Sequence, residues 1–262
     1  MLSRWPFACL YKDTVGHAAY LEKIQAMDLV YAPGTKSLYS DLGLFLLGEV
    51  LERVAGEALD VVAQRRVLGP LGMKDTLYRP GPELTPRIAP TENDPWRGRV
   101  LRGEVHDENA FALGGIAPHA GLFGTAPDLA RFAQMILSGG VFEGRRIVSR
   151  ETVERFTRLA GVPGSTRALG WDTPTNGTTA RSSSPGTPGY SSAGTLFSAR
   201  SFGHTGFTGT SLWIDPERGL FVILLTNRVH PSRQNDAIRQ VRADVADAVV
   251  RALAGWPLAA SP

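Results

Sequence analysis

The last third of the chain alternates short apolar runs with tight turns. Three such runs lie within Ser201–Arg228, and the last, Leu220–Thr226, is almost unbroken. The sequence Pro-Glu-Arg-Gly just before it is typical of a hairpin turn. We therefore predict three antiparallel strands, with Leu220–Thr226 buried on both faces in the middle of the sheet.

Elsewhere the apolar residues recur at helical spacing, and Ser or Thr precedes several of the repeats as a favoured N-cap. Leu47, Val50, Leu51 and Val54 carry the strongest repeat. The predicted helices are Ala19–Asp28, a helix from Ser40 or Asp41 to Gly56, Leu59–Val67, a helix capped by Thr125, a helix capped by Ser149 with Val153 and Phe156 inward, and Gln234–Leu253.

Two stretches lack a periodic pattern. Residues 78–110 are rich in Pro, Arg and turn formers, which indicates a long connection with little regular structure. Residues 173–200 are dominated by Gly, Ser, Thr and Pro, which is typical of a flexible loop. That loop leads into the first predicted strand, where it could cover a pocket.

Helices come first in the chain, then a hairpin-built sheet, then a closing helix. This order is typical of an α+β fold, and no internal repeat is present. We predict a single domain over residues 1–262, in which 42–172 form a mostly helical region and 195–262 form the sheet hairpin and the C-terminal helix.

Composition narrows the class of protein. The chain has 262 residues, of which 43% are hydrophobic and 20% charged, as in ordinary globular proteins. A formal net charge of +3 is too small to indicate a basic surface that binds nucleic acid. The single Cys9 excludes an internal disulfide and a multi-cysteine metal site. We see no signal peptide, the apolar runs are too short to span a bilayer, and the compartment stays open.

Two polar triplets could carry chemistry. Tyr39-Ser40-Asp41 stands at a helix entrance, where a phenol beside a cation can act as a general base. His204-Thr205-Gly206 stands on a strand and could bind an anionic group, and Gly206 would let the N–H of Phe207 approach an oxyanion. The alternatives are that Tyr39 is a half-buried aromatic, Asp41 a simple N-cap and His204 a structural histidine.

Histidines elsewhere give no metal pattern. His106 adjoins Asp107 and Glu108, but no second ligand stands at helical or hairpin spacing, so we interpret this cluster as a hydrogen-bonded loop. His17, His119 and His230 support no site by spacing alone. We expect no metal and no cofactor.

The two triplets occur together with the segments LGLFLLGEVLERVAG, VLGPLGMKDT, HDENAFALGGIAPHAGLFGTAPDLARF, GWDTP and FGHTGFTGTSLWIDPE. Their order and spacing, from about Tyr20 to the C-terminal helix, resemble the serine β-lactamase-related family. That family includes class C β-lactamases, D-alanyl-D-alanine carboxypeptidases and related esterases. The resemblance implies an antiparallel sheet flanked by helices with a mostly helical subdomain, and a bacterial hydrolase that is often periplasmic or secreted. It also implies a small-molecule or peptide substrate with an acyl group.

The resemblance also implies roles for the residues. The family motifs are Ser-x-x-Lys, Tyr-x-Asn, and Lys-Thr-Gly or His-Thr-Gly, and the Ser forms an acyl-enzyme that water hydrolyses. Tyr39 would be the general acid/base, and Asp41 stands where Asn is commoner. His204, Thr205, Gly206 and Phe207 would bind the substrate and its oxyanion. Because His204 replaces the Lys usual in β-lactamases, a peptidase or esterase is favoured.

The first motif is absent. The residues three positions before the four lysines, Lys12, Lys23, Lys36 and Lys74, are Cys9, Tyr20, Pro33 and Leu71. Cys9-Leu10-Tyr11-Lys12 has the shape of the motif with a thiol nucleophile, but Pro6 precedes it and no helix is predicted to follow. We therefore expect a family member without its N-terminal helix and two sheet strands, inactive as given.

Two further interpretations stay open. The chain could be a complete, non-catalytic module that keeps a ligand cleft without a nucleophile. It could also fold poorly alone, because two missing strands would leave a sheet edge exposed.

Overall fold

A computed structural model describes residues 9–174, 185 and 189–254. The chain divides into two compact units, Met1–Asp128 and Leu129–Pro262, and each is described by itself. Helices and short antiparallel strands occur in both units, which confirms the α+β class. The single domain predicted over residues 1–262 stays a prediction. None of the helices in the described ranges is long and apolar enough to cross a membrane.

The first unit is mainly helical, with short strand pairs. Strand β1 pairs with β4, and β2 pairs with β3, both antiparallel. Its elements are a 3₁₀ turn at Leu10–Lys12, α1 (His17–Gln25), α2 (Asp41–Ala55), α3 (Leu59–Ala63), a π-helical turn at Gln64–Leu68, β1 (Leu77–Tyr78), a 3₁₀ helix at Pro82–Arg87, β2 (Asn93–Asp94), β3 (Arg99–Val100), α4 (Glu108–Ala112) and β4 (Leu122–Phe123).

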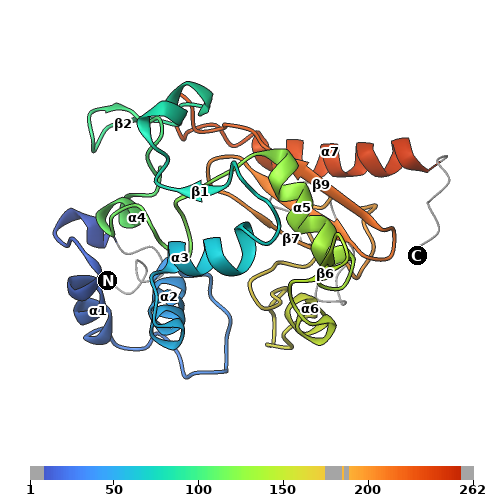
Figure 1. Cartoon of the computed structure of the whole chain (residues 1–262), viewed down its shortest axis with the longest axis horizontal. Coiled ribbons are helices and arrows are strands. Elements are labelled where there is room, and N and C mark those ends of the chain that lie inside the picture. The colour runs from blue at the N-terminus through green and yellow to red at the C-terminus, as the bar shows by residue number, and fades with distance from the viewer. Residues whose placement is uncertain (1–8, 175–184, 186–188, 255–262) are drawn as a thin grey trace. The chain divides into compact units, whose positions relative to one another are not determined.

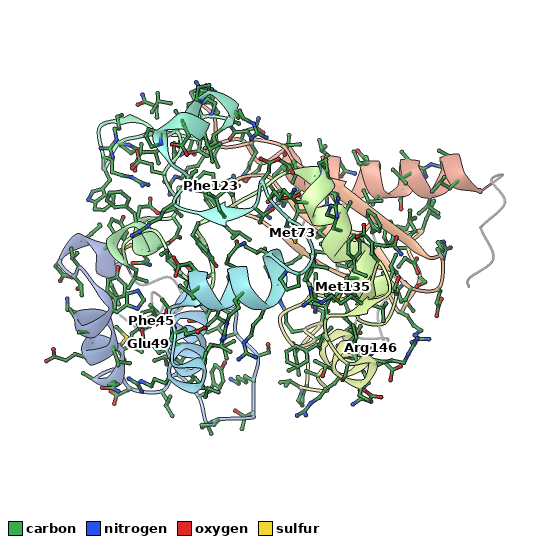
Figure 2. The ribbon with its side chains drawn as sticks, in the orientation of Figure 1. Phe45, Glu49, Met73, Phe123, Met135 and Arg146 are labelled. Atoms are coloured by element: carbon green, nitrogen blue, oxygen red, sulfur yellow. The ribbon has the colours of Figure 1, made fainter. Side chains whose placement is uncertain are left out.

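The core of this unit lies where α1 meets α2. Tyr20 and Ile24 of α1 pack with Leu42 and Phe45 of α2 and with alanines of α4. Figure 1 shows α1 and α2, in blue, side by side. Figure 2 labels Phe45 and Glu49, which lie one turn apart on α2 and both contact His17 of α1.

Helix α2 begins and ends where its sequence predicts. The Oγ of Ser40 accepts a hydrogen bond from the N–H of Gly43 (3.2 Å), and Gly56 ends the helix in the left-handed conformation. The apolar stripe that predicts the helix is nevertheless exposed, with Leu47 at 51% and Val54 at 83%. The buried positions are Leu42, Phe45 and Gly48 instead.

The second unit is built on a three-stranded antiparallel sheet in the order β7-β8-β9. Strand β8 pairs with both neighbours, and Asp215 and Leu220 face each other at the predicted turn. Its elements are α5 (Ala126–Leu137, which begins in the first unit), β5 (Val141–Phe142), β6 (Arg145–Arg146), α6 (Arg150–Thr157), β7 (Phe202–Thr205), β8 (Ser211–Asp215), β9 (Leu220–Leu224) and α7 (Ile238–Leu253).

Alternate residues of the sheet face two different helices. Phe202 and Ile214 pack with Ala133 of α5, while Trp213 packs with Ala246 of α7. This alternation follows from the two-residue period of a strand. The sheet is therefore flanked by a helix on each face, as predicted, and Figure 1 shows its strands with α5 and α7.

Three expectations from the sequence are wrong or untested. Strand β9 is half-buried and has one neighbour among the described strands, so β8 is the middle strand. A continuous apolar run indicates that both faces of a strand are covered, but it gives no information on how many strands pair with it. Phe156 is 47% exposed, whereas Val153 is buried as expected. Nearly half of the predicted loop at 173–200, namely 175–184 and 186–188, lies outside the described residues.

Two buried carboxylates tie the segment before β7 to the sheet and to α7. Asp215 accepts hydrogen bonds from the N–H (2.6 Å) and the Oγ (2.7 Å) of Ser198. Asp247 on α7 accepts from the N–H groups of Thr195 (2.8 Å) and Leu196 (2.9 Å) and from the hydroxyl of Thr195 (3.0 Å). These bonds fix the approach to the strand that carries His204.

Candidate functional site

Tyr39-Ser40-Asp41 lies at the N-terminus of α2. Ser40 is extended, with φ −151°, and it is the N-cap. Asp41 is the first helical residue, where a carboxylate favours the positive end of the helix. Tyr39 precedes them with an exposed side chain. The helix entrance predicted for this triplet is therefore present, with Ser40 rather than Asp41 as the cap.

Asp41 interacts with charged groups outside α2 as well as with the positive end of the helix. Burial raises the pKa of its carboxyl group, the negative charge of Asp107 adds to that rise, and His119 opposes it. Asp107 and His119 reach this point from two other elements, the start of α4 and the turn before β4. A half-buried cluster of titratable groups therefore includes Asp41, two positions after Tyr39.

Asp107 is the N-cap of α4. Its Oδ1 accepts from the N–H of Ala110 (2.7 Å) and lies 3.1 Å from the Nε2 of His119. Burial alone would raise the pKa of Asp107, but the hydrogen bonds from His119 and Ala110 outweigh it and the pKa is lowered. Next to it, His106 pairs with Glu92 at 2.9 Å. The loop is thus hydrogen-bonded, as the sequence predicts.

His204 lies on β7, opposite Leu212 of β8. On the other edge of β7, Asp172 exchanges two backbone hydrogen bonds with Gly203, at 2.7 and 2.9 Å. The Nδ1–H of His204 donates to its neighbour's carbonyl, that of Thr205, at 2.9 Å. This contact leaves Nε2 as the unprotonated nitrogen of a neutral ring.

Burial lowers the pKa of His204, and the positive charge of Arg167 lowers it further. The Thr205 carbonyl and Asp172 act in the opposite direction but do not outweigh burial. The ring is therefore neutral near pH 7, as expected from its type, and supplies no positive charge to an anionic ligand.

Thr205 leads into a tight turn at the end of β7. The N–H of Gly206 donates to Thr210 (2.7 Å), and the N–H of Gly209 donates back to Gly206 (3.1 Å). A Cβ on Gly206 would lie 2.2 Å from the Oγ1 of Thr210, so any larger residue there would displace the Thr210 hydroxyl. Arg242 of α7 closes the turn by donating to the carbonyls of Gly206 (2.7 Å) and Thr210 (2.8 Å).

A pocket of about 360 Å³ opens beside this turn. Thr205, Gly206 and Phe207 line one side, whereas His204 is not among the lining residues. The other side is basic, and it consists in part of Arg228, Arg239 and Arg242. Asp172 and Asp236 also reach the pocket, but each already faces an arginine or a hydroxyl group.

The three arginines differ in how much of their charge is available. The guanidinium of Arg228 covers the Phe207 ring (4.3 Å to the centroid) and donates to the Phe207 carbonyl (2.7 Å). Arg242 is half-buried, burial lowers its pKa, and its Nε has no hydrogen-bond partner in the described part of the chain. Arg239 is exposed on the first turn of α7.

The structure thus places Tyr39 and Asp41 in the first unit and His204, Thr205, Gly206 and Phe207 in the second. Sequence reasoning missed the basic side of the pocket. Arg239 and Arg242 stand three positions apart on a predicted helix, so they share a face. That spacing was the available signal.

Comparisons with known proteins agree with this fold. The beta-lactamase family model matches residues 4–247. An Escherichia coli K12 protein named "Putative D-alanyl-D-alanine carboxypeptidase" is 36% identical over 238 residues, covering 84% of this chain and 51% of that protein. The chain therefore spans about half the length of the curated relatives it matches.

Two solved structures share the fold. The octameric penicillin-binding protein homologue from Pyrococcus abyssi aligns with a TM-score of 0.63 and 20% identity, over 95% of this chain and 52% of that one. Simvastatin synthase from Aspergillus terreus aligns with a TM-score of 0.63 and 17% identity, over 92% and 63%. The α+β fold is therefore β-lactamase/transpeptidase-like, and with most of its length matched by the family model, this chain belongs to the beta-lactamase family.

Proposed function

We propose that this chain is part of a serine hydrolase that cleaves an amide or ester through an acyl-enzyme, and that its substrate is a peptide-like molecule with a free carboxylate. The family membership supports the reaction class. The name of the curated relatives, D-alanyl-D-alanine carboxypeptidase, suggests the substrate class, since such a peptide ends in a carboxylate.

The observation that carries the proposal is the basic pocket beside Thr205–Phe207. An arginine guanidinium binds a carboxylate through charge-assisted, often bidentate hydrogen bonds. Because His204 is held neutral, the charge for such a ligand comes from Arg239 and Arg242 rather than from the His-Thr-Gly histidine. Thr205 would donate its hydroxyl to the same group.

The remaining roles follow from the family resemblance. Tyr39 serves as the general acid/base, and Asp41 holds the entrance of α2. Phe207 presents its N–H to the oxyanion of the tetrahedral intermediate. The nucleophile is not in these residues, because the 262-residue sequence contains no Ser-x-x-Lys. We therefore propose that residues 1–262 bind the substrate but do not form the acyl-enzyme without that motif.

A second candidate function is a non-catalytic ligand-binding module. The same absence of Ser-x-x-Lys favours it. Fluorescent penicillin separates the candidates when applied to residues 1–262 and to a longer protein that supplies the motif. Hydrolase function predicts a covalent label only on the longer protein, with Tyr39→Phe slowing acylation more than binding. A binding module predicts no label on either.

Calorimetric titration of residues 1–262 tests the substrate class. N-acetyl-D-alanyl-D-alanine should bind, and its C-terminal amide should bind about tenfold more weakly, because one charged hydrogen bond is lost. Arg239→Gln should remove most of that difference. Arg251→Gln, an exposed position near the other end of α7, is the matched control and should leave it unchanged. Equal affinity for acid and amide would overturn the proposed role of the basic pocket.

A further inference from the structure

The first unit contains a cavity of about 380 Å³ that the proposed function does not use. That volume is in the range of cavities that hold small organic ligands in proteins. Apolar side chains form most of the wall, with a few polar groups among them. Its lining includes Asp60 and Val61 of α3, Arg65 and Leu68 of the π-helical turn, and Leu77 and Tyr78 of β1.

The helical wall of the cavity contains an irregular turn. The N–H of Gly69 donates to the carbonyl of Gln64 (2.8 Å), five residues earlier, so residues 64–68 wind as a π-helix. A Cβ on Gly69 would lie 2.8 Å from that carbonyl oxygen, so a larger residue would disturb the turn. Turns of this kind are rare and occur frequently at functional sites. Here the turn supplies Gln64, Arg65 and Leu68 to the lining.

Asp60 gives the cavity wall a negative charge. Among the described residues its carboxylate accepts one hydrogen bond, from the N–H of Val61 (3.0 Å), and forms no ion pair. Its charge also acts on the far side of the lining. Burial raises the pKa of the Tyr78 hydroxyl, and the negative charge of Asp60 raises it further. A positively charged group in the cavity would therefore be stabilised beside Asp60.

Arg65 does not balance the charge of Asp60. Its guanidinium pairs with Glu57 at 2.7 Å, and Glu57 is not among the residues that line the cavity. The positive charge of Arg65 is therefore directed to an acid outside the cavity wall. Asp60 remains as the negative charge that a ligand in the cavity would meet.

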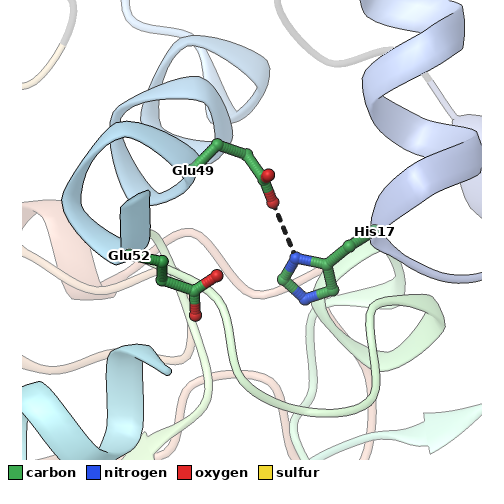
Figure 3. A group of neighbouring side chains, drawn as sticks. All are labelled: His17, Glu49 and Glu52. Carbon is green, nitrogen blue, oxygen red and sulfur yellow. Dashed lines mark hydrogen bonds and ion pairs between the residues drawn. The ribbon is translucent and has the colours of Figure 1, made fainter. Parts of the chain in front are cut away.

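Two acids of α2 differ from Asp60 in having partners on other elements (Figure 3). The Nδ1 of His17, on α1, lies 2.8 Å from Glu49. Glu52 accepts the N–H of Leu59, the first residue of α3 (2.7 Å). The second contact ties α2 to the start of the helix that carries Asp60. The position of Asp60 in the cavity wall is therefore fixed without a ligand.

We propose that this cavity binds a small molecule with an apolar body and one protonated amine. Val61, Leu68 and Leu77 cover the apolar body. The ammonium group donates a charge-assisted hydrogen bond to the carboxylate of Asp60. The ligand is opposite in charge to the one proposed for the basic pocket of the second unit, so the two binding activities are separate. The inference does not depend on the proposed hydrolase function, because binding is measured without a reaction.

Calorimetric titration of residues 1–262 with three indole compounds tests the proposal. Tryptamine has an ammonium group, tryptophol a neutral hydroxyl group and indole-3-acetate a carboxylate, and all three have the same ring. Tryptamine should bind saturably. Tryptophol should bind about tenfold more weakly, because one charged hydrogen bond is lost, and indole-3-acetate more weakly still. Asp60→Asn should lower the affinity for tryptamine to about that for tryptophol.

Asp28→Asn removes an exposed carboxylate of the same unit outside the cavity lining, and this matched control should bind tryptamine as the wild type does. Val61→Trp fills the cavity from a 48% exposed position and should weaken binding of tryptamine. Circular dichroism establishes that each variant is folded. The proposal is overturned if tryptamine does not bind saturably, if tryptophol binds equally well, or if Asp60→Asn and Asp28→Asn have the same affinity. Unchanged binding by Val61→Trp would equally overturn it.

Discussion

The charge state of His204 is set by its position on β7. Burial removes the water that would stabilise an imidazolium, and Arg167 adds a like charge. The Thr205 carbonyl fixes which nitrogen carries the proton. A histidine held in this way contributes hydrogen-bond geometry at neutral pH, so under the proposed function the carboxylate is recognised by the arginines of α7 instead.

The same lowered pKa predicts how stability depends on pH. An unfolded histidine titrates near 6.5, and folded His204 titrates below that value. Between the two pKa values the unfolded chain binds more protons, so the free energy of unfolding falls as pH drops through the folded pKa. His204→Gln should therefore lose less stability than the wild type between about pH 7.5 and pH 5.

Urea unfolding at both pH values measures this effect. His230→Gln, at an exposed position, is the control and should follow the wild type. Parallel losses of stability in His204→Gln and the wild type would contradict the assigned shift.

Residue type and order in the chain were enough to find Tyr39 and His204, because their triplets resemble family motifs. They were not enough to find His119 and Arg242. His119 meets Asp41 only through the folded first unit, and Arg242 meets Gly206 only when α7 packs on the sheet. Contacts between distant segments leave no local period in a sequence.

Among the secondary-structure elements, helix starts were the most predictable feature. Ser40 and Ser149 both accept a hydrogen bond from an N–H three residues later, so each cap depends on neighbouring residues alone. The buried face of a helix was less predictable. Val54 and Phe156 continue apolar repeats and are exposed, because burial depends on which other element packs against the helix.

Helix α7 is held to the segment before β7 by Asp247. This carboxylate is buried and accepts two backbone N–H groups and one hydroxyl. Asp247→Ala leaves these donors without a partner, and each such donor costs about 1–3 kcal/mol. We expect the free energy of unfolding to fall by about 3 kcal/mol.

Asp244→Ala is the matched control, because Asp244 is exposed one turn earlier and bonds only the Gln240 side chain among the interactions described. It should change stability by less than about 0.5 kcal/mol. Urea unfolding compares the two variants. A similar loss in both would show that Asp247 does not anchor the segment.

For the molecule as a whole, the order of helices, hairpin sheet and closing helix was enough to predict the α+β class. The number of strands beside β9 was not predictable. A continuous apolar run indicates that both faces of a strand are covered, but it does not indicate how many strands pair with it. The match to this chain covers only about half of the length of these relatives. The substrate and the source of the nucleophile therefore belong to the proposals above, whereas the family follows from the match itself.

The exposed apolar residues of α2 predict a property of the whole chain in solution. Leu47, Val50, Leu51 and Val54 are 51%, 53%, 43% and 83% exposed and follow one another at helical spacing. Contiguous apolar surface in water favours association. We expect the apparent molar mass of residues 1–262 to rise with concentration, and Leu47→Lys with Val54→Lys to suppress that rise.

Light scattering across a concentration series measures this effect. Lysine has a higher helix propensity than valine and a similar one to leucine, so the double variant should keep the stability of the wild type in urea. Val100→Lys with Val241→Lys adds the same two charges at exposed positions outside the stripe and is the control. If all three proteins associate equally, the stripe on α2 does not drive association. If only the α2 variant stays monomeric, the chain associates through the stripe, because the control carries the same added charge and still associates.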